Sequence, residues 1–151
     1  MKSIGFALVA GLLIAFGLLF IGQPHPEKTA YISITFDDGY ASQYGAAKLL
    51  ENYSYRGTFY IPSAFIGKEF EDISVMSLQQ LKDLQARGHE IGGHTANHVL
   101  ASRVSAEVYD ADVLEGKKVL EDYNFSTENF AIPGGDDSKK ESALNCFETT
   151  R

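Results

Sequence analysis

The sequence predicts an α/β fold with a parallel sheet, either open or barrel-like, built from about four strand–helix units. Short apolar, β-branched runs alternate along the chain with stretches whose apolar residues recur at spacings of three and four, which is the spacing of one helix face. Glycine or proline follows most of the predicted elements, which indicates turns between them. Strands that alternate with helices pair in parallel, because each helix carries the chain back to the same edge of the sheet.

Residues 1–22 are predicted to form a signal anchor, which is a single N-terminal transmembrane helix. Residues 4–21 are uncharged and Lys2 precedes them. This length is near the lower limit for a helix that spans a bilayer and long for the core of a cleaved signal peptide. Lys2 favours a cytoplasmic N-terminus. We therefore expect a single-pass protein of the cell membrane with an extracytoplasmic domain; a secreted protein with a cleaved signal peptide is the alternative.

Residues 23–30 are expected to form a linker, since they include Pro24 and Pro26, and residues 31–151 are expected to form one domain. The net charge of −7 argues against nucleic acid as a partner, because contacts to phosphates need clustered Lys and Arg. The single Cys146 excludes a disulfide within the chain. Packing or a metal ion must therefore hold the domain together.

The first strand, the first helix and the second strand are expected between residues 31 and 61. Residues 31–36, Tyr-Ile-Ser-Ile-Thr-Phe, are a β-branched and apolar run that is typical of a strand. Residues 40–52 follow with apolar side chains at helical spacing. Residues 57–61, Gly-Thr-Phe-Tyr-Ile, form the second such run. Pro62 ends it, because proline lacks the N–H that a continuing strand would donate.

The second helix and the third strand are expected on either side of Gly88. Ser77 and Gln80 have the spacing of a capping box, which predicts that a helix begins at this point. Gly88 is a typical stop signal for such a helix. Residues 89–92 then predict the third strand.

The last elements are a long helix, a fourth strand and the start of another helix. Ser105 is the predicted cap of the long helix. Residues 130–132 predict the fourth strand, and residues 139–147 begin the next helix. The apolar stripe of the long helix is spaced by threes and fours and comprises Ala106, Tyr109, Val113, Gly116, Leu120 and Tyr123.

Potential metal ligands follow the ends of two predicted strands. Asp37 and Asp38 come directly after the first strand, and His94 and His98 after the third. The C-terminal ends of parallel strands meet at one edge of a sheet, so we expect these side chains to lie together. Histidines at positions i and i+4 face one point if the segment is helical. Two histidines and one carboxylate leave a coordination position open, as in catalytic zinc sites.

The two aspartates are expected to have different roles. Adjacent strand residues point to opposite faces, so both carboxylates reach one site only where the strand breaks. Gly39 allows such a break. One carboxylate would then bind the metal and its neighbour would act as a base, which predicts metal-assisted hydrolysis.

The segment Thr-Phe-Asp-Asp-Gly at 35–39, followed by His-Thr-x-x-His at 94–98, resembles the first two motifs of the polysaccharide deacetylases, the NodB-homology or carbohydrate esterase family 4 group. The segments 57–61 and 81–92 are similar as well. The resemblance runs from about residue 31 to the end of the chain. It implies a truncated (β/α) barrel of the polysaccharide deacetylase type, a partial NodB-homology domain that removes acetyl groups from N-acetylglucosamine-type residues of a polysaccharide.

The resemblance also implies the roles of individual residues. Asp37 would be the general base, and Asp38, His94 and His98 would bind a divalent metal. Zinc is the expected ion, although cobalt, nickel or manganese accept the same ligands. An acetylated polysaccharide would be the substrate, and the membrane would be the partner of the N-terminal helix.

Two departures from the family pattern are visible. Ala131 stands where much of the family has an arginine that would brace the catalytic carboxylate, and Gly134 replaces an aromatic residue that lines the sugar groove. The family's later motifs, which include an acid histidine, have no counterpart in these 151 residues. We therefore expect weak N-deacetylation or none, higher residual activity on O-acetyl esters, and exposed strand edges that favour association.

Two other functions compete with deacetylation. In the first alternative, the chain is an inactive remnant that binds a metal or a glycan without turnover. In the second, it is a metal-dependent hydrolase of a non-carbohydrate amide or ester. A separate polypeptide that supplies the missing half of the barrel is a further expected partner if the domain is active.

Overall fold

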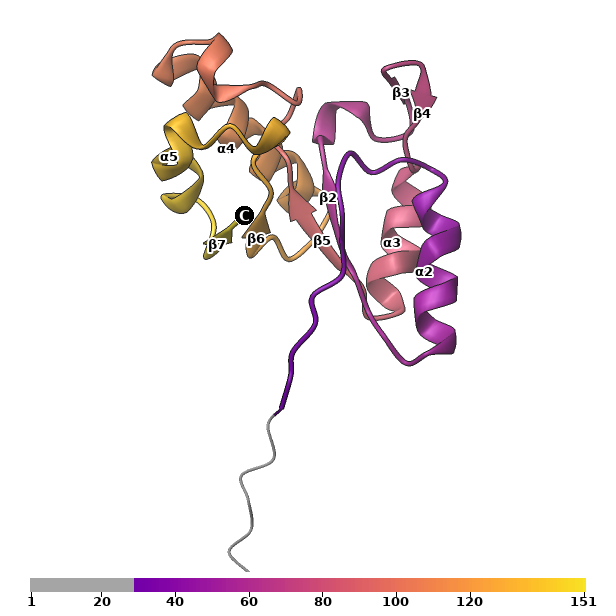
Figure 1. The fold of residues 1–151 in the computed structure, drawn as a ribbon. Helices are drawn as coiled ribbons and strands as arrows, with labels where there is room; N and C mark the ends of the chain where they lie inside the picture. The colour runs from indigo at the N-terminus through magenta and orange to yellow at the C-terminus, as the bar shows by residue number, and fades with distance from the viewer. Residues whose placement is uncertain (1–28) are drawn as a thin grey trace, which may run out of the picture. The chain divides into compact units, whose positions relative to one another are not determined.

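The computed structural model describes residues 29–151 (Figure 1). The chain divides into two units, Met1–Ile32 and Ser33–Arg151. Residues 29–32 of the first unit have no regular structure. The predicted anchor at 1–22 and all but the end of the predicted linker lie outside the described residues. Within residues 29–151, no helix has both the length and the apolar character needed to span a bilayer.

The second unit contains a parallel sheet of five strands, in the order β1-β2-β5-β6-β7. Each successive strand lies beside the preceding one in this sheet (Figure 1), which confirms the predicted parallel α/β arrangement. A separate antiparallel hairpin, β3–β4, follows β2. The strands are β1 (Thr35–Phe36), β2 (Thr58–Ile61), β3 (Glu69–Phe70), β4 (Ile73–Ser74), β5 (Glu90–Gly93), β6 (Asn129–Phe130) and β7 (Thr149–Thr150).

Helices connect the strands of the sheet, and α2 lies beside α3 while α5 lies beside α4 (Figure 1). The α-helices are α2 (Gln43–Asn52), α3 (Leu78–Ala86), α4 (Ala106–Asp122) and α5 (Lys140–Leu144). Short 3-10 helices are η1 (Ser63–Phe65), η2 (Ala101–Arg103), η3 (Pro133–Gly135) and η4 (Asp137–Lys139).

The capping signals in the sequence correctly mark where α3 and α4 begin. The Gln80 N–H donates to Ser77 Oγ, and the Ser77 N–H donates to Gln80 Oε1, so the predicted capping box is present. The Ser105 side chain accepts from the Val108 N–H at the start of α4. These bonds pair backbone donors that have no partner within the helix.

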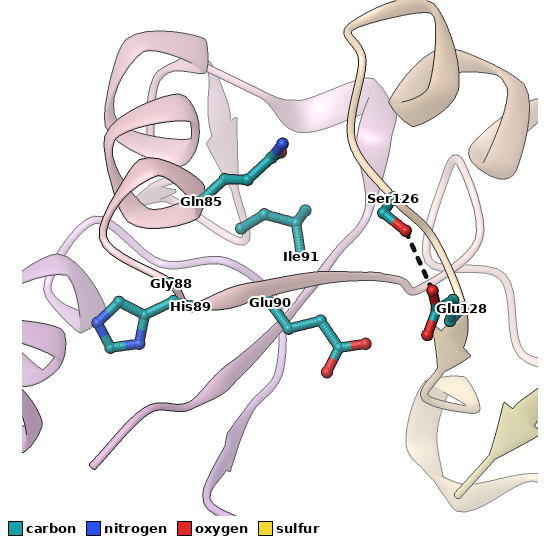
Figure 2. Close-up of a pocket in the computed structure, with 7 residues that line it drawn as sticks. All are labelled: Gln85, Gly88, His89, Glu90, Ile91, Ser126 and Glu128. Carbon is teal, nitrogen blue, oxygen red and sulfur yellow. Dashed lines mark hydrogen bonds between the residues drawn. The ribbon is translucent and has the colours of Figure 1, made fainter. Parts of the chain in front are cut away.

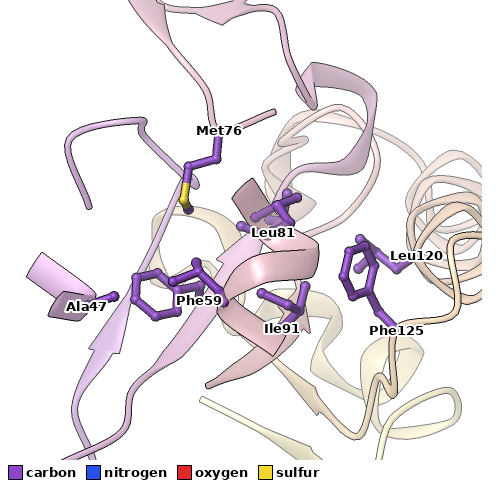
Figure 3. Packing of buried hydrophobic residues seen from close by; sticks show 9 residues of the cluster. Ala47, Phe59, Met76, Leu81, Ile91, Leu120 and Phe125 are labelled. Carbon is purple, nitrogen blue, oxygen red and sulfur yellow. The ribbon is translucent and has the colours of Figure 1, made fainter. Parts of the chain in front are cut away.

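The hydrophobic core has two parts. One lies between β2, β5 and the helices α2, α3 and α4; Figure 3 shows Phe59 and Ile91 of the strands beside Leu81 and Leu120 of the helices. The second packs α4 and α5 against β6, with Tyr109 and Phe130 fully buried. The middle of the predicted α4 stripe is buried in these clusters. Its two ends, Ala106 and Tyr123, are exposed, because they lie at the helix termini beyond the packed strands.

The predicted boundaries of the first strand and the first helix are wrong. Pairing of β1 with β2 starts where the Thr58 N–H donates to the Ile34 carbonyl (3.0 Å), and Tyr31, which has no strand partner, is 92 % exposed. The helix begins at Gln43, not at residue 40, because Tyr40 forms a β-bridge with Val75 instead.

The β3–β4 hairpin and β7 were not predicted from the sequence. The hairpin turns at Glu71 and Asp72, whose φ angles are +51° and +60°; the pair Glu-Asp is not one of the typical hairpin-turn dipeptides, which carry glycine at one position. The strand β7 contains two threonines, which is too short to give a periodic pattern. The sheet edge next to β6 is therefore covered by β7, and the fourth predicted strand is not an edge strand.

Candidate metal centre

Three predicted ligands converge after the ends of β1 and β5. The Asp38 Oδ1 atom lies 3.4 Å from His94 Nε2 and 3.1 Å from His98 Nε2. All three atoms lie within 4.8 Å of one another. Ligand atoms placed tetrahedrally about 2.0–2.1 Å from a zinc ion are roughly 3.3 Å apart. The spacing is therefore that of a site that could hold a divalent ion.

Asp38 reaches this point because the chain leaves the extended conformation directly after β1. The φ angles of Asp38 and Gly39 are +67° and +66°. This left-handed region is accessible to glycine and, among other residues, most readily to Asn and Asp. The strand thus breaks at the position that the sequence predicts. Asp38 lies beside His94 and His98, whereas Asp37 contacts Arg151.

The segment that carries both histidines is a turn, so the helical condition under which His94 and His98 were expected to face one point is not met. Thr95 and His98 have φ angles of +59° and +55°. The two rings nevertheless approach each other, with centroids 4.8 Å apart and planes inclined at 66°. A turn with two left-handed residues therefore brings both Nε2 atoms to one point.

Asp112 of α4 holds this turn in place. Its carboxylate accepts from the Asn97 N–H (3.1 Å) and from Asn97 Nδ2 (2.6 Å), and its backbone carbonyl accepts from the Ala96 N–H (3.0 Å). The backbone N–H groups of Ala96 and Asn97 therefore donate to Asp112 of α4. Because these groups do not bond within the segment, the segment does not form a helix. The one sequence signal for this role is a charged residue, Asp112, directly beside Val113 of the apolar stripe. In the structure Asp112 is buried.

Gly116 allows α4 to approach the turn closely. A Cβ atom at this position would lie 2.5 Å from the Thr95 carbonyl carbon and 2.7 Å from the Ala96 nitrogen. Both are backbone atoms, so neither can move aside without moving the histidine turn. Gly116 is therefore a contact point between helix and turn, in addition to its predicted place in the apolar stripe.

The ring orientation of His94 is fixed by the strand beside it. His94 Nδ1 lies 2.7 Å from the Ala131 carbonyl oxygen; a carbonyl accepts, so Nδ1 carries the proton and donates. In the neutral ring, Nε2 then presents a lone pair toward Asp38, as metal-binding histidines do.

The Asp38 carboxylate fits a cation better than a hydrogen-bond donor. Within the described residues, the buried Asp38 Oδ1 atom has no hydrogen-bond partner. Such an atom is costly to bury without a partner. A buried carboxylate oxygen that faces two imidazole nitrogens is the donor set that a divalent ion completes, so these residues fit the metal that the sequence predicts.

The local electrostatics favour the metal-binding protonation states. The close approach of His94 holds the pKa of Asp38 below its ordinary value, although burial opposes this. Burial lowers the pKa of His98. An ionised carboxylate and neutral imidazoles are the forms that bind metals.

Phe70 of β3, Phe65 of η1 and Tyr40 form an aromatic wall beside His98. The Phe70 ring centroid is 4.8 Å from that of His98 and 4.8 Å from that of Phe65. Tyr40 stacks on Phe70 at 6.4 Å. The wall shields one side of the His98 ring, and sequence reasoning did not locate it because the hairpin was not predicted.

Asp37, the predicted base, lies outside the group of three ligand atoms and is partly exposed. Its Oδ1 atom accepts from Arg151, and its backbone carbonyl accepts from Gln43 Nε2. The sequence alone indicates no partner for this carboxylate, because Ala131 stands where much of the family has an arginine.

The backbone conformation at position 134 favours glycine over a larger residue. Its φ angle is +63° within η3, and a Cβ atom there would lie 2.7 Å from Leu100 Cδ2. An aromatic side chain at this position would require both a rearranged backbone and a displaced Leu100.

A separate cavity of about 230 Å³ lies at the other end of β5, lined by Gln85, Gly88, His89, Glu90, Ile91, Ser126 and Glu128 (Figure 2). The buried His89 ring uses both nitrogens structurally: Nδ1 accepts from the Gly57 N–H (3.0 Å), and Nε2 donates to Glu51 (2.8 Å). Glu90 begins β5, whereas His94 follows its last residue. This cavity is therefore not part of the candidate metal centre.

Comparison with known proteins gives consistent matches. The family model for polysaccharide deacetylase matches residues 24–145. The peptidoglycan-N-acetylglucosamine deacetylase of Bacillus cereus is 38 % identical over 112 residues, which cover 73 % of this chain and 49 % of that protein. A second curated relative, YxkH of Bacillus subtilis, is 25 % identical over 134 residues, which cover 87 % of this chain and 46 % of YxkH. The chain thus spans about half the length of these relatives.

Solved structures share the fold. IcaB from Ammonifex degensii has a TM-score of 0.68 and 25 % identity, with 75 % of this chain and 55 % of that chain covered. The Streptococcus pyogenes deacetylase PplD, solved in complex with acetate, has a TM-score of 0.67 and 22 % identity, with 87 % and 56 % covered. These similarities support the expected fold class, a curled parallel half-barrel with helices.

The contact between α4 and the histidine turn predicts an effect on stability. The substitution Gly116→Ala should lower the free energy of unfolding by about 1–3 kcal/mol, because overpacking against backbone atoms outweighs the higher helix propensity of alanine. Urea unfolding of the chain measures this change. Glu115→Ala, at an exposed position of the same helix, is the control and should stay within about 0.5 kcal/mol of the wild type. A Gly116→Ala protein as stable as this control would contradict the close contact.

Proposed function

Because this chain belongs to the polysaccharide deacetylase family, we propose that it removes N-linked acetyl groups from N-acetylglucosamine-type residues of a polysaccharide by metal-assisted hydrolysis. The observation that carries this proposal is the convergence of Asp38, His94 and His98, with a second carboxylate next to Asp38 in the sequence. The name of the Bacillus cereus relative supports the substrate class.

The proposed ligands are Asp38 Oδ1 and the Nε2 atoms of His94 and His98. A bound divalent ion, zinc by preference, supplies Lewis acidity to the acetyl carbonyl. The Ala131 carbonyl keeps the His94 ring in the orientation that leaves Nε2 free, and Asp112 keeps the histidine turn in place.

Asp37 is the proposed general base. It takes a proton from water as the water oxygen forms a bond to the acetyl carbonyl carbon. The sugar nitrogen then accepts the proton that Asp37 took from the water, the carbon–nitrogen bond breaks, and an amine and acetate are released. The partly exposed position of Asp37, outside the group of three ligand atoms, suits a residue that exchanges protons with water.

Metal binding is the first test of these assignments. Replacement of His98 by Ala should reduce the affinity for zinc by at least roughly 10–100-fold. That is the loss seen when a residue that only supports a ligand is removed, and His98 is a proposed ligand itself. Asp37→Asn should keep the wild-type affinity, because Asp37 is not a ligand. Zinc content after dialysis and titration calorimetry measure both. Equal zinc content in the wild type and the His98→Ala protein would overturn the ligand assignment.

Acetate release tests the activity itself. Wild-type chain incubated with an N-acetylglucosamine oligomer should release acetate only slowly, because the family's acid histidine has no counterpart in these 151 residues, and a chelator should abolish the release. Asp37→Asn should reduce the rate by about 10²–10⁴-fold, the usual contribution of a general base. O-acetylated oligosaccharide is a second substrate, because an alcohol leaves more readily than an amine.

Other outcomes separate the competing functions. Zinc binding without acetate release from either glycan would identify a binding module. Release of acid only from non-carbohydrate amides or esters would identify a hydrolase of another substrate class. Acetate release that a chelator does not change would contradict the metal-assisted mechanism.

We also propose that residues 1–22 anchor the chain in the cell membrane with the domain outside the cytoplasm. The support is the uncharged stretch 4–21 after Lys2. The chain should sediment with membranes, and protease added to intact cells should degrade residues from about 24 onward. A soluble secreted product that lacks about the first 22 residues would instead establish a cleaved signal peptide.

A further inference from the structure

We propose that Arg151 positions the carboxylate of Asp37 for its role as base. This inference rests on the proposed function, since it assigns a partner to the proposed general base. Arg151 Nη2 donates to Asp37 Oδ1, across 114 positions of the sequence. Within residues 29–151, Asp37 forms no other ion pair.

The backbone of Arg151 is fixed by the strand beside it. The Arg151 N–H donates to the Phe130 carbonyl (3.0 Å), and the Arg151 carbonyl accepts from the Ile132 N–H (2.9 Å). The register pairs Phe130 with Thr150, so the next residues, Ala131 and Arg151, lie side by side. Paired residues of neighbouring strands project from the same face of a sheet. Arg151 therefore presents its side chain on the face that Ala131 occupies with a methyl group.

The side chain then reaches Asp37 across Tyr60. The guanidinium carbon of Arg151 lies 4.8 Å from the centroid of the Tyr60 ring, and Tyr60 is a buried residue of β2. Stacking on this ring restricts the planar guanidinium. Gln43 Nε2 bonds to the Asp37 backbone carbonyl, so the main chain and the carboxylate of Asp37 have separate partners.

Curvature of the sheet makes this contact possible. Asp37 follows β1 and Arg151 follows β7, which are the two outer strands of the described sheet. In a flat sheet, four spacings of about 4.8 Å would separate these strands by roughly 19 Å, much more than one arginine side chain spans. The curl brings the ends of both outer strands to one side of the proposed centre.

Orientation explains this contact better than stability does. The side chains of Arg151 and Asp37 are 45 % and 42 % exposed, and exposed ion pairs add little to folding stability. Arg151 also offsets the repulsion between the adjacent carboxylates of Asp37 and Asp38. Removal of Arg151 should therefore leave the fold and the metal ligands intact and disturb the proposed base alone.

The kinetic test uses the full chain and an aryl acetate ester, whose leaving group needs no protonation. Arg151→Ala should reduce kcat by roughly 10²-fold, the effect of a misplaced reacting group, with KM and zinc content unchanged. Arg151→Lys should recover part of the loss, because it keeps the charge but not the planar fork. Adding Ala131→Arg to Arg151→Ala should also restore part of kcat. The control is Arg103→Ala, an exposed arginine on η2, which should behave as the wild type.

A spectroscopic test does not depend on activity. In the wild type, NMR of the Arg151 guanidinium should show separate Nη signals, because the ion pair hinders its rotation, and Asp37→Asn should merge them. Merged signals in the wild type, unchanged kcat in Arg151→Ala, or loss of zinc from that variant would each overturn the proposal. A wild type that binds no zinc and cleaves no ester would refute the proposed function, while the guanidinium signals would still decide whether the ion pair exists.

Discussion

The contact between α4 and the turn after β5 is the interaction on which the candidate metal centre depends. Asp112 accepts both the backbone N–H and the side-chain amide of Asn97, and Gly116 lets the helix backbone touch the turn. Because these contacts fix the left-handed residues of the turn, they also fix the direction of His94 and His98. A helix far from the strand ends in sequence therefore determines the geometry of two of the three ligands.

Curvature of the sheet is the second constraint. It brings the ends of the outer strands β1 and β7 together, so that Asp37 and Arg151 meet although they are 114 positions apart. The proposed metal ligands and the proposed base lie after the C-terminal ends of the strands, where barrels of strands and helices carry their active sites. His89, at the opposite end of β5, has both ring nitrogens occupied and ties α2 to the start of β2. The candidate metal centre thus lies at one end of the sheet, and the structural contacts of His89 lie at the other.

The departures from the family pattern have local physical causes. Gly134 has a left-handed backbone and lies against Leu100, so the aromatic residue of the family pattern does not fit there without rearrangement. Ala131 lacks a charge, but its backbone carbonyl orients His94, and Arg151, directly after β7, lies beside it. Compared along the sequence alone, position 131 has lost the positive charge of the family's arginine. In the structure, Arg151 supplies a positive charge to Asp37 from the neighbouring segment.

The sequence by itself determined the parallel α/β fold, the helix starts at Ser77 and Ser105, and the convergence of Asp38 with His94 and His98, because periodicity, caps and strand ends are local signals. The tertiary structure decided the rest. A turn and not a helix carries the histidines, since α4 accepts the backbone N–H groups that a helix would use internally. The short strand β7, the β3–β4 hairpin and the partner of Asp37 depend on contacts between segments distant in sequence, and such contacts leave no periodic pattern along the chain.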